Sequence, residues 1–129
     1  RAFSDEAMAA MVKGLNEIAP GIAGGMGATA EVDTQVLFPP LVNDPAEATF
    51  VADVAAALVG EDMVEREAPQ IMASEDFPHM MKDRPGAYLN IGTGLEATGV
   101  HHPSYDFNDA VLPLGASFWA RLVETRLGK

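Results

Sequence analysis

Apolar side chains recur every three or four positions in three parts of the chain, a spacing that predicts three longer helices. The first helix is expected to begin at Ser4, whose hydroxyl can cap exposed backbone amides, and to break or kink at Pro20 before a cluster of glycines ends it. The second is expected to begin at Asp44, with Pro45 in its first turn, and to end at Gly60.

The last helix is expected over residues 112–127, after a loop that ends near residue 108. Its predicted buried face follows helical spacing, with Leu112, Ala116, Trp119, Val123 and Leu127, widened by Leu114, Phe118 and Leu122. A shorter helix of a turn or two is predicted after Ser74, because Pro78 and Pro85 restrict its length.

Alternation of polar and apolar residues predicts a half-buried strand over 29–37, which Pro39 and Pro40 would end. Residues 63–66 and 87–91 are predicted as two more strands, the second of them buried. Helices interspersed with strands indicate an α/β architecture in two unequal pieces, with the boundary within residues 39–43.

Charge and composition narrow the classes of function. The 129 residues carry a net charge of −11 and no cysteine. A strongly acidic chain without a basic patch is a poor partner for nucleic acid or for an anionic membrane surface. The absence of cysteine excludes disulfides and thiolate metal sites and fits a reducing compartment such as the cytoplasm.

Candidate chemistry begins with histidine. His101 and His102 are adjacent in the loop before the last helix, and Pro103 favours an extended conformation for His102. Neutral imidazole is a common ligand for zinc-like ions, but neighbouring side chains of an extended loop point to opposite sides, so one of the two would face a given ion. A catalytic zinc takes three protein ligands, so other groups must complete such a site. The alternative is an exposed loop in which Asp106 and Asn108 only cap the helix.

Two other segments offer polar groups. Ser74, Glu75 and Asp76 precede the short helix, where carboxylates can take part in acid–base chemistry or only complement the helix N-terminus, and where exposed amides can bind a carboxylate. The glycine-rich segment 92–94 lacks the lysine and the spacing of a phosphate loop. It better fits a close approach of the backbone to a ligand or to a neighbouring segment.

Four linked motifs occur in order along the chain: MASEDF at 72–77, PGAYLNIGTG at 85–94, HHPSYDFND at 101–109 and LPLGA at 112–116. Together they closely resemble the C-terminal part of the family of metal-dependent aminoacylases, hippurate hydrolases and auxin–amino acid conjugate hydrolases. Residues 1–3 resemble the end of a strand in that family's lid, and residues 39–45 resemble its crossing from lid to catalytic domain. The resemblance covers essentially the whole chain.

The resemblance implies a fold and an activity. Residues 1–38 would be the remainder of an α+β lid that commonly mediates dimerisation, and residues 39–129 the C-terminal part of an α/β catalytic domain of co-catalytic metallopeptidase-like fold. Enzymes of this family hydrolyse the amide bond of N-acyl amino acids. They use two divalent ions per active site, with Zn²⁺ the first candidate and Mn²⁺, Co²⁺ or Ni²⁺ the others, and a metal-activated water.

The resemblance also implies roles for single residues. His101 matches the family's last metal ligand, and His102 falls at a variable position near the rim of the pocket. The residues that match its substrate-bordering segments are Ser74, Glu75, Gly92, Thr93 and Arg1. No residue of this chain matches a catalytic acid or base.

The family's other metal ligands and its general-base glutamate belong to an N-terminal half whose motifs this sequence lacks. We therefore expect a C-terminal segment of a longer amidohydrolase that is inactive alone, exposes apolar surface, and has as partners the missing N-terminal half and, through the lid, a second copy. One alternative is a non-catalytic α/β module that dimerises or completes another chain. A weaker one is a small domain with its own zinc site at His101, His102 and Asp106.

Overall fold

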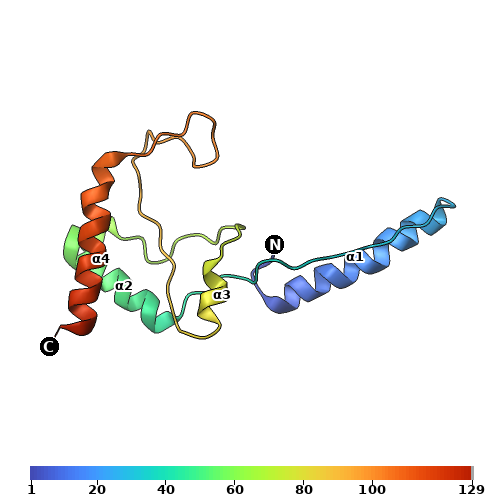
Figure 1. Ribbon diagram of the computed structural model, residues 1–129, viewed down its shortest axis with the longest axis horizontal. Coiled ribbons are helices and arrows are strands. Elements are labelled where there is room, and N and C mark those ends of the chain that lie inside the picture. The colour runs from blue at the N-terminus through green and yellow to red at the C-terminus, as the bar shows by residue number, and fades with distance from the viewer. Residues whose placement is uncertain (129) are drawn as a thin grey trace. The chain divides into compact units, whose positions relative to one another are not determined.

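The computed structural model describes residues 1–128. Within them, helices are joined by long loops (Figure 1). The helical elements, in order, are α1 (Asp5–Gly25), α2 (Pro45–Val59), the 3₁₀ helix η1 (Glu61–Met63), α3 (Phe77–Met81), the 3₁₀ helix η2 (Asp109–Val111) and α4 (Leu112–Leu127). None of these helices is both long enough and apolar enough to cross a membrane.

The elements fall into two compact units. Unit 1 consists of residues 1–43 and 69–86 and contains α1 and α3, whereas unit 2 consists of residues 44–68 and 87 onward and contains α2, η1, η2 and α4. The units do not coincide with the predicted domains, 1–38 and 39–129, because residues 39–43 and 69–86 group with the N-terminal helix. The domain assignment concerns a longer fold and stays a prediction.

Helix α1 begins as predicted, because the Ser4 hydroxyl accepts a hydrogen bond from the backbone N–H of Ala7 at 3.1 Å. Of the predicted break or kink at Pro20, the break is wrong, since the helix continues through Pro20 to Gly25. A proline removes one backbone donor, and the hydrogen bonds of the neighbouring turns suffice to continue the helix. The apolar stripe of α1 stays largely exposed, including Leu15 and Ile18.

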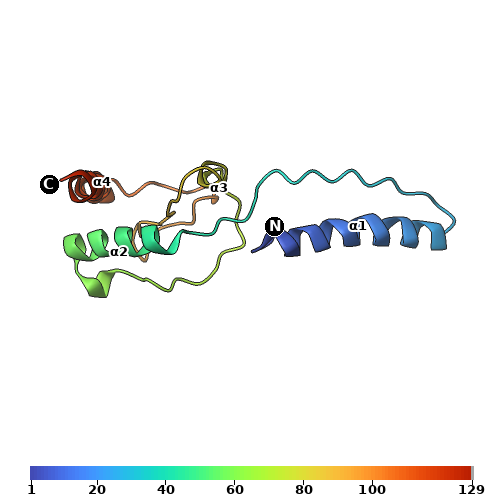
Figure 2. The ribbon, with the colours of Figure 1, turned by 90° about the horizontal axis from the view of Figure 1, so that it is seen from below.

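The predicted strands do not form in the part of the chain that the structure describes. Residues 29–37 return as an unpaired segment along α1 (Figure 2), and residues 87–91 form a loop. Residue 63 ends η1 instead of beginning a strand over 63–66. A strand needs hydrogen bonds to a neighbouring strand, and none of residues 1–128 provides them. The α/β class is therefore unconfirmed, and the described chain is helical.

Unit 2 is built on the packing of α4 across α2 (Figures 1 and 2). Its core consists of Val54 from α2 and of Phe118 and Leu122 from α4, with Phe50 and Leu89 packed against it. Burial of these side chains is the main favourable contribution to the stability of the unit. The helices that the apolar spacing predicted therefore supply this core.

The buried face of α4 differs from the prediction. Phe118 is 4% exposed, whereas Trp119, expected at the centre of the buried face, is 64% exposed. Leu112, Val123 and Leu127 are exposed with it. Two adjacent apolar stripes run along this helix, and spacing alone does not reveal which one faces α2. The second stripe leaves an apolar surface on α4 that the sequence had predicted to be buried.

Polar contacts at the ends of both helices reinforce the packing. Arg126 of α4 forms an ion pair with Glu47 of α2, and its guanidinium lies 4.0 Å from the centre of the Phe50 ring. The arginine thus contacts an acid and an aromatic face of the same helix, a geometry that favours arginine over lysine.

A second arginine ties η1 to α2. The Nε of Arg66 donates to Glu61 at 2.6 Å, and its Nη2 lies 2.9 Å from Oδ1 of Asp53. The hydrogen bond from Arg66 lowers the pKa of the Glu61 carboxyl, and the two acids raise the pKa of the Arg66 guanidinium. The three side chains hold the turn that follows α2.

Asp44 caps α2 as the sequence predicts. Its Oδ1 accepts hydrogen bonds from the backbone N–H groups of Ala46 at 2.9 Å and Glu47 at 3.0 Å, and the helix ends at Gly60, whose φ of +94° favours glycine. We expect Asp44→Ala to lower the free energy of unfolding by about 1 kcal/mol, measured by urea denaturation. Asp44→Asn, which keeps the acceptor, should lose far less, and equal losses for the two variants would contradict this role.

Candidate functional site

Unit 1 brings together two of the residues that were predicted to border the substrate. The Nε of Arg1 donates to the Ser74 hydroxyl at 2.8 Å, and its Nη1 donates to the backbone carbonyl of Met72 at 3.3 Å. These residues lie 73 and 71 positions apart in the sequence. The loop before α3 thus fixes the direction of the Arg1 guanidinium.

The acids beside Ser74 lie at the start of α3, where the sequence places them. Asp76 occupies the position before α3, but its side chain makes no cap hydrogen bond, and the carbonyl of Asp76 accepts from the backbone of His79 at 3.0 Å. Glu75 is half-buried next to Ser74.

In unit 2, the glycine-rich segment is held by Asn108, which was expected only to cap a helix. The Nδ2 of Asn108 donates to the backbone carbonyl of Thr93 at 2.8 Å, while its Oδ1 accepts from the N–H of Ala110 at 3.1 Å. Asn108 therefore caps η2 and also holds the loop at 92–94, where Gly94 has a φ of +112°. Its place before a helix predicts the cap, but no sequence pattern indicates the bond to Thr93.

The two adjacent histidines differ in their surroundings. The Nδ1 of His102 accepts a hydrogen bond from the backbone N–H of Ser104 at 3.1 Å. The exposed His101 ring has no hydrogen bond to any residue in 1–128. The assignment of His101 as a metal ligand stays a prediction.

A complete metal site does not form within the described residues. No group of three or more histidine, aspartate or glutamate side chains in residues 1–128 is placed to hold an ion. The small zinc site considered at His101, His102 and Asp106 is therefore not formed. A single exposed imidazole can fill one coordination position, so this part of the chain does not by itself fit the two-ion centre that the resemblance implies.

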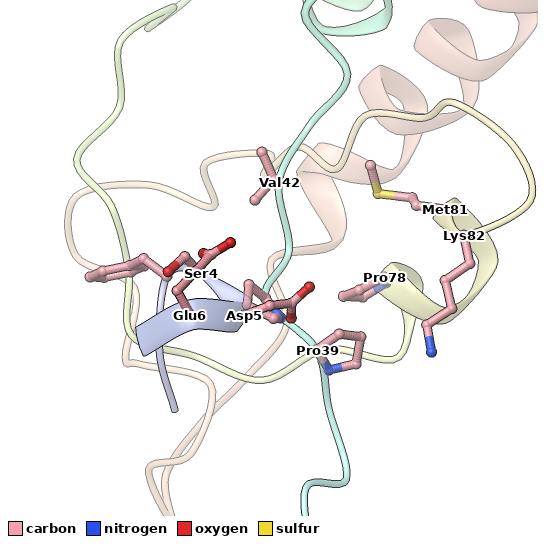
Figure 3. A pocket seen from close by; sticks show the side chains of 10 residues that line it. Ser4, Asp5, Glu6, Pro39, Val42, Pro78, Met81 and Lys82 are labelled. Atoms are coloured by element: carbon pink, nitrogen blue, oxygen red, sulfur yellow. The ribbon is translucent and has the colours of Figure 1, made fainter. Parts of the chain in front are cut away.

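A hollow of about 400 Å³ lies in unit 1 (Figure 3). The acidic start of α1 forms one side and the residues of α3 the other, as the figure shows. Ser4 and Glu6 line it, and hydrogen bonds from the backbone N–H of Glu6 and from the Ser4 hydroxyl lower the pKa of the Glu6 carboxyl. The hollow contains none of the predicted substrate-bordering residues.

A second hollow, of about 370 Å³, lies in unit 2 and includes Thr93. Its other walls are mostly apolar: Ile91, Phe107, Val111, Leu112, Gly115, Ala116 and Trp119. The exposed stripe of α4 forms one of these walls, so the hollow belongs to the apolar surface already described.

His79 in unit 1 was also not predicted to have a role, and its Nε2 lies 3.0 Å from the carbonyl oxygen of Leu37.

Comparisons with known proteins agree with the resemblance. The family described as "Peptidase family M20/M25/M40" matches residues 4–125. N-acetylcysteine deacetylase of Bacillus subtilis is 34% identical over 125 residues, which are 95% of this chain and 31% of that protein. Hippurate hydrolase of Campylobacter jejuni is 30% identical over 122 residues, 95% of this chain and 32% of that protein.

A plant relative gives the same result. IAA-amino acid hydrolase ILR1-like 6 of Arabidopsis thaliana is 29% identical over 135 residues, 98% of this chain and 29% of that protein. The chain thus spans about a third of the length of these curated relatives. No solved structure matches it.

Proposed function

This chain belongs to peptidase family M20/M25/M40, and from that membership we propose that it is part of an enzyme that hydrolyses the amide bond of N-acyl amino acids. The observation that carries the proposal is the family match over residues 4–125, which includes all four linked motifs. The names of three relatives support the substrate class, because N-acetylcysteine, hippurate and an IAA–amino acid conjugate each join an acyl group to an amino acid through an amide.

We propose His101 as one ligand of a divalent metal ion, with Zn²⁺ as the first candidate. The exposed ring without a partner supports this choice. When bound, such an ion polarises a carbonyl and makes water a stronger nucleophile at neutral pH. Because the described residues do not complete a metal site, the remaining ligands and the general base belong to a part of the enzyme outside this chain, and no step of the reaction is assigned to the residues present.

The segments that resemble the family's substrate-bordering loops are each proposed to border the substrate. The contact between Arg1 and Ser74 supports this for unit 1, and the Asn108-supported loop at Gly92 and Thr93 supports it for unit 2. Glu75 is assigned to the same border through its position beside Ser74.

A second copy of the protein is proposed to associate through residues 1–38. The apolar stripe of α1 supports this, because Leu15, Ile18 and Ile22 are each more than half exposed. Exposed apolar stripes of this kind commonly mark a contact surface. The apolar surface of α4 is assigned instead to the rest of the enzyme, since it lies beside the segment at 92–94.

The proposal predicts a difference between this chain and a longer one. The 129-residue chain alone should release no measurable amino acid from N-acetylcysteine or hippurate, even with added Zn²⁺ or Mn²⁺, because the described residues hold no metal cluster. The polypeptide encoded by the complete reading frame should release it. Turnover above blank by the 129 residues would contradict the assignment of the general base to another part of the enzyme.

If the reading frame encodes these residues and nothing else, that result would favour the alternative of a non-catalytic module that dimerises or completes another chain. The measurement is the release of a free amine, followed by reaction with an amine-specific reagent. A relative such as the hippurate hydrolase provides the positive control, assayed on the same substrates.

A further inference from the structure

One side chain joins the two ends of the loop formed by residues 94–107. The Nδ2 of Asn108 donates to the backbone carbonyl of Thr93 at 2.8 Å, across 15 positions of the sequence. The backbone hydrogen bonds inside the loop are local, because each closes a turn of four residues. They run from the N–H of Ala97 to the carbonyl of Gly94, from His102 to Gly99 and from Tyr105 to His102. These turns shape parts of the loop, but they do not connect its ends.

The amide of Asn108 is used on both sides. While Nδ2 contacts Thr93, Oδ1 accepts a hydrogen bond from the N–H of Ala110 at 3.1 Å and caps η2. Helix η2 leads directly into α4, which supplies Phe118 and Leu122 to the core of unit 2. The base of the loop is therefore tied to the packed part of the unit and not only to another loop.

His101 lies inside this loop, in the turn that the N–H of His102 closes on the carbonyl of Gly99 at 2.9 Å. The exposed His101 ring makes no hydrogen bond within residues 1–128, so the backbone of the loop determines where the ring lies. Thr93 stands at the base of the same loop. A loop that opens at its base would therefore move His101 relative to Thr93.

We infer that Asn108 is a positioning residue, which closes the base of the loop 94–107 on η2 and so fixes the place of His101 relative to Thr93. The inference rests on the proposed function for the roles of His101 and Thr93 at a catalytic site. A loop that is ordered in advance loses less conformational entropy when a ligand binds to it. The bond to Thr93 is thus the part of Asn108 that serves the site, and the cap of η2 is its anchor.

Nuclear magnetic resonance of the 129-residue chain tests the closure without turnover. Asn108→Asp keeps an acceptor for the cap and removes the donor to Thr93, whereas Asn108→Ala removes both. In both variants the carbonyl ¹³C signal of Thr93 should shift. The amides of His102 and Tyr105 should exchange with solvent about two- to tenfold faster, the effect of one lost hydrogen bond. The amide signal of Ala110 should move in Asn108→Ala and far less in Asn108→Asp.

Asn90→Asp is the matched control, because it makes the same chemical change at an exposed asparagine of the same unit. It should leave the exchange of the His102 and Tyr105 amides at the wild-type rate. Wild-type exchange in Asn108→Asp, or an equal increase in Asn90→Asp, would overturn the inference. An increase confined to Asn108→Ala would also overturn it, because the cap of η2 alone would then order the loop.

The polypeptide of the complete reading frame tests whether the closure serves the reaction. Asn108→Asp should lower kcat/KM for hippurate by about two- to tenfold, with kcat changed more than KM, and Asn90→Asp should lower neither. Faster exchange with an unchanged kcat/KM would overturn the positioning of His101. If the wild-type polypeptide hydrolysed no amide, the proposed function would fail, while the exchange rates would still decide whether Asn108 closes the loop.

Discussion

Replacing His101 by alanine in the complete enzyme is expected to abolish amide hydrolysis and to lower the metal content of the purified protein. Loss of an outer-shell partner of a metal site already costs about 10–100-fold in affinity or activity, and loss of a ligand should exceed that range. The exposed ring, which has no hydrogen-bond partner among residues 1–128, is free to take this role. The measurement is the rate of amine release together with the number of metal ions per chain.

His102→Ala is the matched control, because it removes the neighbouring imidazole from the same loop. The Nδ1 of His102 already accepts from the backbone of Ser104, so its removal should leave the metal content at the wild-type value. If His102→Ala lost the metal and His101→Ala kept it, the two residues would have been assigned in the wrong order. Full turnover by His101→Ala would remove His101 from the site altogether.

Phe118→Ala should have the largest effect on stability. Phe118 is 4% exposed and belongs to a core of three buried residues with Val54 and Leu122, so its truncation leaves a cavity between α2 and α4. Large-to-small substitutions of this kind cost about 3–5 kcal/mol, which is a large part of the stability of a small domain. Urea denaturation followed by helical circular dichroism measures the loss.

Trp119→Ala provides the control in the same helix. Trp119 is 64% exposed, so its removal should cost less than about 1 kcal/mol despite its larger side chain. The edge of one ring meets the face of the other, with the Phe118 and Trp119 centres 5.9 Å apart, and this contact accounts for a small loss. Comparable losses in the two variants would show that the buried face of α4 includes Trp119.

The helices were predictable because their signals are local. Ser4 and Asp44 cap the helices that the sequence predicts there, and Gly60 ends the second one. A cap bonds to amides two or three residues further along the chain, so a short window of sequence contains the whole interaction. Pro20 shows the limit of such signals, because a long helix continues through one missing hydrogen bond.

The choice between two faces of α4 and the formation of strands depend on distant residues. Spacing places Phe118 and Trp119 on adjacent apolar stripes, and the contact with Val54 on α2 decides which of them is buried. The alternation of polar and apolar residues at 29–37 likewise predicts which side chains would share a face of a sheet, but it does not indicate which other strand would pair with this segment. Pairing is a non-local property, and no neighbouring strand lies within residues 1–128.

The candidate site was reached through motifs and not through spacing. Arg1 and Ser74 are 73 residues apart, and no periodicity connects them, yet both match segments that border the substrate in the resembled family. The bond from Asn108 to Thr93 was missed for the same reason, since an asparagine before a helix is explained completely by its capping role. The sequence motifs therefore identified candidate site residues that hydrophobic spacing alone would have assigned only to loops.

Hydrolysis of hippurate by the polypeptide of the complete reading frame, before and after chelation, tests the central claim most directly. The account predicts that glycine and benzoate appear in equal amounts, that a chelator stops their release, and that added Zn²⁺ restores it. Release that continues in the chelated protein, or no release from hippurate, N-acetylcysteine or an IAA–amino acid conjugate by the folded protein supplied with Zn²⁺, would contradict it.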